Sequence, residues 1–290
     1  MFDTVAIVGL GLLGGSLGMA LRSRKLARRV VALVRREATL DEGHRMGALD
    51  EGSLEPAVVA GAELIVLAPP VQQIAPLARN IAPFLDAGAL VTDVGSTKAA
   101  LAREIPTLLP AGREFLGGHP MAGSELTGVL HAREDLFEHT VYLLTPTATT
   151  RPESLARLRE LACRLGACPL ELGPEVHDAA VARISHLPHV AAAALATAAG
   201  VGGDAALLSR IAAGGFRDTT RIAGGSPEMW RDICVTNREA VLTALGVYEG
   251  TLGAFRTALE QGDGSRLLEL FQEGRQARAD LAAATGEGKR

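Results

Sequence analysis

One histidine and one carboxylate stand in a stretch that otherwise holds small residues, proline and methionine. The stretch reads Gly117-Gly118-His119-Pro120-Met121-Ala122-Gly123-Ser124-Glu125. Its glycines let the backbone come close to a ligand, and Pro120 restricts the chain beside His119, so we expect the histidine to be held at a bend. Because histidine titrates near neutral pH, His119 is a candidate for proton transfer. A hydrogen-bonded structural histidine in a turn explains this stretch alone equally well.

A glycine motif lies near the start of the chain. Residues 4–8 form a short β-branched run, a G-x-G-x-x-G pattern follows, and a helical pattern covers residues 17–23. The first glycine makes the turn, the second lets the backbone approach a pyrophosphate, and the third packs helix on strand. The N–H groups at the start of the helix then face the phosphates. The predicted cofactor contacts here are Gly9, Gly11, Leu12, Leu13 and Gly14.

The second predicted strand, residues 29–34, is followed by Arg35 and Arg36. NAD-binding proteins of this kind carry an acidic residue near this position, which accepts the ribose hydroxyls. An arginine pair can instead bind a 2′-phosphate, so the sequence favours NADP over NAD as the cofactor. Two alternatives stay open: a solvated basic loop, and a ribose contact from Glu37 or Asp41.

Strands and helices continue to alternate through the first half of the chain. Further strands are predicted at residues 63–68, 89–94, 114–117, 140–144 and 169–172, with helices at 71–85 and 152–165. Ligands of open α/β sheets lie beyond the carboxyl ends of the strands. This rule places Pro69, Ser96, Lys98 and His119 on the same rim as the glycine motif.

Helical periodicity takes over after residue 173, and the predicted fold has two parts. Residues 1–173 form a Rossmann-type, doubly wound α/β domain, and residues 174–290 form a helical domain that closes the site and makes a dimer. Helices are predicted at residues 175–200, 227–260 and 265–284. Pro188 should kink the first of these.

Polar residues interrupt the helical half at two places. His186 and His189 share a helix face beside Pro188, and buried histidines need hydrogen bonds. They are either satisfied core residues or contacts to a substrate; a metal pair has no third ligand at useful spacing, so we predict no metal site. Farther on, Gly214 precedes Arg217 and Arg221, which suit carboxylate binding or surface ion pairs.

The composition excludes several classes of protein. A formal net charge of -4 and an aromatic content of 3% argue against nucleic acid or an anionic membrane as partner. No apolar run is expected to reach the length that spans a bilayer. Three cysteines without metal-ligand spacing fit a reducing cytoplasm better than a disulfide framework.

Six motifs in order give the chain a resemblance to a known family. They are residues 9–16 (GLGLLGGS), 93–98 (DVGSTK), 118–125 (GHPMAGSE), 185–189 (SHLPH), 214–221 (GGFRDTTR) and 229–232 (MWRD). Together they resemble the prephenate/arogenate dehydrogenases of tyrosine biosynthesis, also called cyclohexadienyl dehydrogenases. The resemblance implies an oxidative decarboxylation of prephenate or arogenate with hydride transfer to NAD(P), in a homodimer.

The resemblance also implies roles for individual residues. His119 is expected to accept the proton of the substrate hydroxyl, with Ser96 as its partner at that hydroxyl, and Arg221 to bind a substrate carboxylate. The remaining positions expected to line the substrate pocket are Ser124, Glu125, His186, His189 and Gly214. Prephenate and arogenate differ in one side-chain group, and the sequence leaves open which of them is preferred and whether tyrosine inhibits.

Two other functions fit part of the pattern. A β-hydroxyacid dehydrogenase has a similar two-domain build but usually relies on a lysine in its helical domain, and residues 175–256 contain none. A non-catalytic NADP-binding sensor would leave His119, Ser96 and Arg221 idle. Six ordered motifs favour the prephenate/arogenate dehydrogenase over both.

Overall fold

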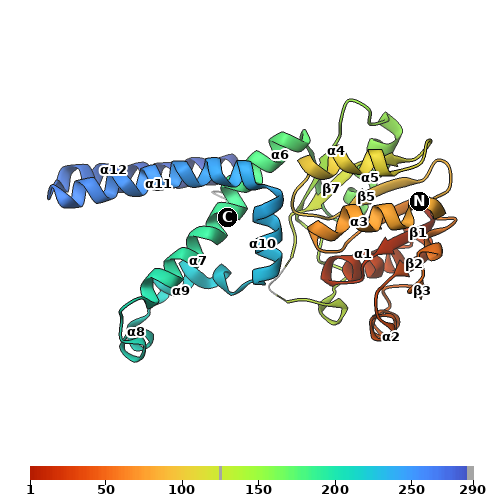
Figure 1. Cartoon of the computed structure of the whole chain (residues 1–290), viewed down its shortest axis with the longest axis horizontal. Helices are drawn as coiled ribbons and strands as arrows, with labels where there is room; N and C mark the ends of the chain where they lie inside the picture. Colours follow the sequence, from red (N-terminus) through yellow and green to blue (C-terminus); the bar gives the residue numbers. More distant parts are fainter. Residues whose placement is uncertain (124–125, 286–290) are drawn as a thin grey trace. The chain divides into compact units, whose positions relative to one another are not determined.

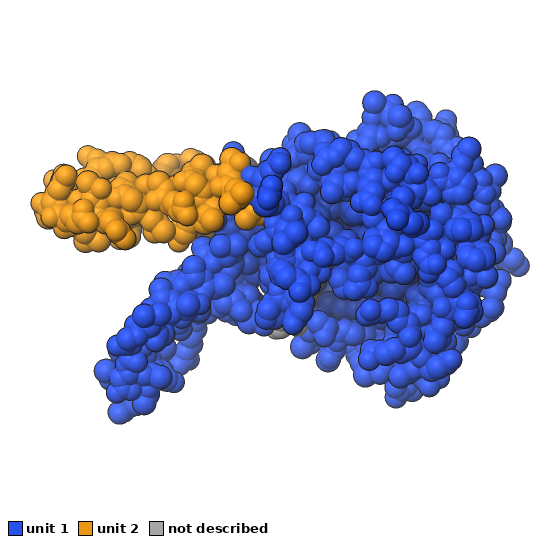
Figure 2. Space-filling view, in the orientation of Figure 1, with its two compact units in different colours: residues 1–240 blue, residues 241–290 orange. Residues whose placement is uncertain are grey.

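The computed structural model describes residues 1–123 and 126–285 of the 290-residue chain. The chain forms two compact units, residues 1–240 and residues 241–290, which Figure 2 distinguishes by colour. The first unit contains the described strands and the helices up to α10. The predicted domain division at residues 173 and 174 marks a change from mixed to helical structure and stays a prediction.

Six strands form a parallel sheet in the order β3-β2-β1-β4-β5-β6. They are β1 (Phe2–Val8), β2 (Ala27–Leu33), β3 (Glu51–Ser53), β4 (Leu64–Leu67), β5 (Leu90–Asp93) and β6 (Glu114–Phe115). Val5 of β1 pairs with Val30 of β2 on one side and Leu64 of β4 on the other. The strand order reverses between β1 and β4, where open α/β sheets bind their ligands. The predicted α/β class of the first half is confirmed.

Helices cover both faces of this sheet, because its strands are apolar on both sides (Figure 1). Val5 and Ile7 belong to one core, which includes residues of α1 (Leu12–Ser23) and α5 (Pro152–Arg164) and against which Leu40 of α2 (Glu37–Arg45) packs. Ala6 and Val8 belong to the other core, with α3 (Val71–Ile81) and α4 (Ala99–Leu108). Because successive side chains of β1 point to opposite faces, this strand packs against helices on both faces of the sheet.

The next three strands form a separate sheet in the order β7-β8-β9, so the predicted strand over residues 114–117 is divided between the two sheets. They are β7 (Gly117–Pro120), β8 (Val141–Thr145) and β9 (Cys168–Glu171), with β7 antiparallel to β8. Gly117 and Gly118 let β7 pass close to the end of β5. A Cβ atom at Gly117 would lie 2.4 Å from Thr145 Oγ1, and one at Gly118 would lie 2.8 Å from the Asp93 carbonyl oxygen. His119 therefore lies in a strand and not at the predicted bend.

A long helical run begins the second half of the first unit. It consists of α6 (Pro174–Val181), a π-helical turn (Ala182–His186) and α7 (Leu187–Gly200). Pro188 lies in the first turn of α7, directly after the π-helical turn, which accommodates the missing N–H group. By length and composition alone the run from Pro174 to Gly200 could cross a membrane, so the expectation that no apolar run reaches that length is wrong. The core helix of a soluble protein passes the same test.

The remaining helices are α8 (Ala205–Ile211), α9 (Gly214–Thr220), α10 (Pro227–Thr236), α11 (Arg238–Glu260) and α12 (Gly264–Thr285). Short 3₁₀ turns occur at Pro56–Val59, Ala82–Phe84, Val129–His131 and Arg221–Gly224. The predicted single helix over residues 227–260 is broken at Asn237, whose backbone leaves the helical region. In the second unit, α11 and α12 are joined through Gly262. The ring centroids of Phe255 and Phe271 lie 5.2 Å apart.

Candidate active site

The glycine motif connects β1 to α1 and has the shape that a pyrophosphate needs. Gly9 has a φ of +95°, and a Cβ atom at Gly14 would lie 2.2 Å from the Gly9 carbonyl oxygen. At Gly11 a Cβ atom would meet nothing within 4 Å, so the backbone there is open to a ligand. No side chain caps the first turn of α1, where Leu12 and Leu13 lie, and no acidic residue stands in it. The loop therefore fits a dinucleotide by its backbone and its helix N-terminus.

Two other predicted cofactor contacts flank this loop. Pro69 follows β4 and packs against Gly9, whose added Cβ atom would lie 3.0 Å from the Pro69 nitrogen. Arg35 and Arg36 follow β2 and are exposed. Neither guanidinium has a hydrogen bond or an ion pair with any residue that the structure describes. Both arginines are thus available to an anionic group near the end of β2.

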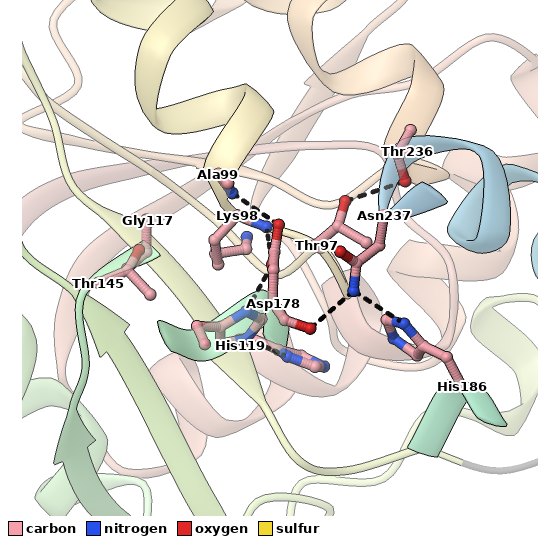
Figure 3. A network of polar contacts seen from close by, with 12 residues as sticks. Thr97, Lys98, Ala99, Gly117, His119, Thr145, Asp178, His186, Thr236 and Asn237 are labelled. Atoms are coloured by element: carbon pink, nitrogen blue, oxygen red, sulfur yellow. Dashed lines mark hydrogen bonds and ion pairs between the residues drawn. The ribbon is translucent and has the colours of Figure 1, made fainter. Parts of the chain in front are cut away.

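A chain of three buried polar side chains forms the centre of the site. His119 Nδ1 lies 2.8 Å from His177 Nε2, and His177 Nδ1 lies 2.8 Å from Asp178 Oδ1. Asp178 also accepts hydrogen bonds from the backbone N–H groups of Lys98 and Ala99, at 2.7 and 2.9 Å, and so caps the start of α4 (Figure 3). One carboxylate therefore anchors both the helix and the histidine pair.

The hydrogen bonds determine which ring nitrogens carry protons. Burial raises the pKa of Asp178, but hydrogen bonds from His177 and from two backbone N–H groups outweigh it and hold that pKa below its usual value. The Asp178 carboxylate is therefore ionised and accepts the Nδ1–H of His177, which leaves His177 Nε2 to accept the Nδ1–H of His119. The lone pair of His119 then sits on Nε2, which makes no hydrogen bond to any described residue.

His119 is kept neutral by its surroundings. Its exposed fraction is 8%. Burial, followed by the charges of Lys98, His177 and His186, holds the pKa of His119 well below its ordinary value of 6.5. A neutral imidazole with a bare Nε2 can accept a proton, as a general base requires.

A buried ion pair holds the strand that carries His119. The side chains of Lys98 and Asp93 are both fully buried and form an ion pair. Lys98 Nζ also donates to the Gly118 carbonyl oxygen at 2.9 Å, while Asp93 accepts from the Gly118 N–H at 3.2 Å. The N–H and C=O groups of Gly118, the residue before His119, are therefore both held by this ion pair. Lys98 is 1% exposed, so its ammonium group is held inside the protein.

His186 and His189 are brought together around Trp230 of α10. The ring of His189 stacks on Trp230 with centroids 3.4 Å apart, and the His186 ring meets Trp230 edge-on at 6.2 Å. Burial, against the opposing charge of Asp178, lowers the pKa of His186 to about 4. Burial also lowers the pKa of His189, and the charge of Arg221 adds to this. Arg221 is therefore within electrostatic reach of His189.

The side chains of the other predicted site residues that the structure describes make no hydrogen bond to the histidines of the site. Arg221 follows α9, is exposed, and has no hydrogen bond or ion pair among the described residues; Gly214 begins α9 and is also exposed. Ser96 is half-buried in the loop between β5 and α4, and its hydroxyl has no hydrogen-bond partner in the described part of the chain. Ser124 and Glu125 lie outside the described residues. Within the described ranges, no group of three or more histidine, cysteine, aspartate or glutamate residues could hold a metal ion.

Sequence reasoning missed four residues that the structure brings to this site: His177, Asp178, Trp230 and Asn237. Trp230 stands in the motif at residues 229–232, and another signal was present for two of the others. His177 and Asp178 are adjacent polar residues in α6, between the apolar Val176 and Ala179. Asn237 gave no comparable signal, because its two partners lie 59 and 51 residues away along the chain.

Comparison with protein families gives two matches that together cover most of the chain. The nucleotide-binding domain of prephenate dehydrogenase matches residues 17–169. The dimerization domain of prephenate dehydrogenase matches residues 173–273.

Similar proteins and structures extend over nearly the whole chain. The prephenate dehydrogenase of Bacillus subtilis (strain 168) is 35% identical over 97% of this chain and 76% of the relative, and the cyclohexadienyl dehydrogenase of Zymomonas mobilis subsp. mobilis (strain ATCC 31821 / ZM4 / CP4) is 32% identical over 97% of each. The structure of Synechocystis arogenate dehydrogenase is 35% identical, with a TM-score of 0.83 over 96% of this chain and 99% of that chain. Prephenate dehydrogenase from A. aeolicus, in complex with hydroxyphenyl propionate and NAD+, is 30% identical, with a TM-score of 0.90 over 97% of this chain and 99% of that chain.

Proposed function

Because the chain belongs to the prephenate dehydrogenase family, we propose that it oxidatively decarboxylates prephenate, arogenate or both, with NAD(P) as the hydride acceptor. The substrate loses a hydride from the ring carbon that bears the hydroxyl, and carbon dioxide leaves as the ring becomes aromatic. The products are 4-hydroxyphenylpyruvate from prephenate and tyrosine from arogenate. The observation that carries the proposal is the buried chain from Asp178 through His177 to His119.

We assign the hydroxyl proton of the substrate to His119 Nε2, which takes it as the hydride leaves and returns it to the phenolate oxygen once carbon dioxide has left. As that nitrogen takes the proton, the ring becomes cationic, and the hydrogen bond from its Nδ1–H to His177 strengthens. Asp178 stabilises the charge through His177, as the carboxylate of a catalytic triad does for its histidine. The dinucleotide, with its pyrophosphate at the loop formed by Gly9, Gly11 and Gly14, would supply the nicotinamide that accepts the hydride. Ser96 is assigned to the same hydroxyl as a hydrogen-bonding partner.

The substrate carboxylate is assigned to Arg221. Its guanidinium is exposed, has no partner among the described residues, and acts electrostatically on His189. Arginine is suited to bidentate binding of a carboxylate. His186, His189 and Gly214, together with Ser124 and Glu125, are assigned to the lining of the substrate pocket.

For the cofactor we propose a preference for NADP over NAD. The support is the pair of exposed, unpartnered guanidinium groups of Arg35 and Arg36 after β2, where no acidic residue occupies the position that binds a ribose. The A. aeolicus relative was solved with NAD+. NAD remains the competing cofactor, and Glu37 at the start of α2 is the residue that would favour it.

We propose that the protein is a homodimer of the cytoplasm. The match to a dimerization domain covers residues 173–273, and many large apolar side chains in this range are exposed in the single chain. Examples are Ile184, Leu195, Val247 and Phe271, at 63%, 42%, 68% and 66% exposed. A second copy of this chain would cover such side chains, and this accounts for the apolar run from Pro174 to Gly200 without a membrane.

A two-by-two assay on purified protein tests the function. Prephenate or arogenate is combined with NAD or NADP, and formation of the reduced nicotinamide is followed by its absorbance. Turnover in any combination establishes the reaction, and the fastest combination identifies substrate and cofactor. If folded protein that binds the cofactor is inactive in all four combinations, a non-catalytic NADP-binding sensor replaces the proposal. An NAD-only result would remove the role given to Arg35 and Arg36.

A further inference from the structure

Asn237 joins two parts of the site that come from different elements. It lies at the break between α10 and α11 and is 5% exposed. Its amide nitrogen Nδ2 lies 2.8 Å from the carbonyl oxygen of Asp178 and 3.2 Å from His186 Nδ1 (Figure 3). One buried amide thus contacts both the residue that anchors the histidine chain and a histidine assigned to the substrate pocket.

The orientation of this amide follows from its partners. A carbonyl oxygen can only accept a hydrogen bond, so the group that faces Asp178 must be the amino group of Asn237. The same amino group faces His186 Nδ1 and has a second hydrogen to donate. His186 Nδ1 must therefore be the unprotonated nitrogen of a neutral ring, and the proton must lie on Nε2.

We propose that Asn237 is a positioning residue that holds His186 in the tautomer with a protonated Nε2, so that His186 offers the substrate a hydrogen-bond donor. His186 is 1% exposed, and no described residue accepts a hydrogen bond from its Nε2. A nearly buried donor without a protein partner is satisfied by a ligand or by water. The role of His186 toward the substrate rests on the proposed function, whereas the assignment of its tautomer rests only on the hydrogen bond to Asn237.

His189 provides a built-in comparison. Its Nδ1 lies 2.9 Å from the Ser185 carbonyl oxygen, so Nδ1 carries the proton and Nε2 carries the lone pair. The two histidines are three residues apart and are held in opposite tautomers by different partners. His186 therefore presents a donor and His189 an acceptor.

Nitrogen NMR of histidine-labelled protein tests the tautomer directly, because protonated and bare imidazole nitrogens resonate in separate regions. Comparison with His186→Gln assigns the His186 signals. We expect a bare Nδ1 in His186 and a protonated Nδ1 in His189 at neutral pH. A protonated Nδ1 in His186 of the unaltered protein overturns the proposal without any variant.

Asn237→Asp tests whether Asn237 sets the tautomer. The carboxylate has no hydrogen to donate, so His186 Nδ1 should gain a proton while the His189 signals stay in place. Asn80→Asp is the matched control, since it makes the same change at an exposed position on α3. A folded Asn237→Asp protein in which His186 Nδ1 is still bare contradicts the role of Asn237.

Kinetics test the role toward substrate. Asn237→Ala removes both hydrogen bonds, and loss of a fixed donor should raise KM for the better substrate about tenfold, with kcat changed by less than about threefold. An unchanged KM with a fall in kcat shows that Asn237 acts on Asp178 alone and overturns the substrate role. If no substrate is turned over, the proposed function fails, and the NMR result still decides the tautomer.

Discussion

His119 draws its chemical character from neighbours that are distant in the sequence. Hydrogen bonding from Asp178 through His177 leaves its lone pair on Nε2, and burial keeps the ring neutral. Burial disfavours the charged ring at rest, whereas the hydrogen bond to His177 stabilises the charge that forms when the proton is taken up. At the scale of the residue, the site is therefore organised to present one neutral base.

Replacement of this base tests the assignment. His119→Asn should lower kcat about 10²- to 10⁴-fold, because the hydroxyl loses its proton acceptor. Cofactor affinity, measured by fluorescence titration, should stay within about threefold of the unaltered protein, since the glycine loop is untouched. His44→Asn is the control, an exposed histidine on α2. Unaltered turnover in His119→Asn would rule out the assigned role.

Arg221 makes a separable contribution. Arg221→Ala should raise KM by about 10- to 100-fold, since a charge-assisted bond to the substrate carboxylate is lost. The change in kcat should be smaller. Arg217→Ala, four residues earlier in α9, is the matched control. The carboxylate assignment fails if steady-state kinetics give the same KM for Arg221→Ala as for the unaltered chain.

The depressed pKa of His186 predicts how stability changes with pH. In the unfolded chain this histidine takes up a proton near pH 6.5, but in the folded chain only near pH 4. Its contribution to the free energy of unfolding is thus complete above pH 6.5 and decreases as pH falls toward 4, by up to about 3 kcal/mol. Urea unfolding at several pH values measures this. His186→Gln should show a weaker decrease over that range, and His44→Gln should not differ from the unaltered protein.

At the scale of elements, the loop between β1 and α1 contains glycines with two different roles, one in packing and one in ligand approach. Gly14 is needed for packing, because an added Cβ atom would lie 2.2 Å from the Gly9 carbonyl oxygen. Gly11 has open space beside it and is needed only if a ligand fills that space. The two positions therefore give different predictions for the same substitution.

Gly11→Ala should leave thermal stability nearly unchanged and weaken cofactor binding at least tenfold, because its methyl group enters the space assigned to the pyrophosphate. Gly14→Ala should lower the melting temperature as well, because the backbone of the loop must shift. Calorimetry measures both quantities. Wild-type cofactor affinity in Gly11→Ala would show that the pyrophosphate does not approach this residue.

At the scale of the whole molecule, exposed apolar side chains on α7, α11 and α12 are numerous for a protein that acts alone. All of them except Leu281 lie within the range that matches a dimerization domain. Assembly of two chains and not insertion into a bilayer is the expected consequence, because α6 and the π-helical turn carry the buried His177, Asp178 and His186 of the site.

Light scattering coupled to size-exclusion chromatography tests this assembly. The unaltered chain should elute with the mass of two copies, without detergent. Phe271→Glu should shift the population toward the single chain, because a charge would be buried in the contact. Leu54→Glu, at an exposed apolar position after β3, should leave the mass unchanged. A monomeric unaltered protein would refute the dimer.

The sequence by itself determined the nucleotide fold, the glycine loop, the candidate base His119 and the family. These features are written in contiguous stretches, where the spacing of residues fixes their local geometry. Only the tertiary structure decided that β7 leaves the first sheet, that Lys98 is buried, and that His177, Asp178 and Asn237 support the site. The physical reason for the last three is that their contacts join positions 51 to 80 residues apart. Local periodicity assigns a residue to a face, but the packing of whole elements decides what that face meets.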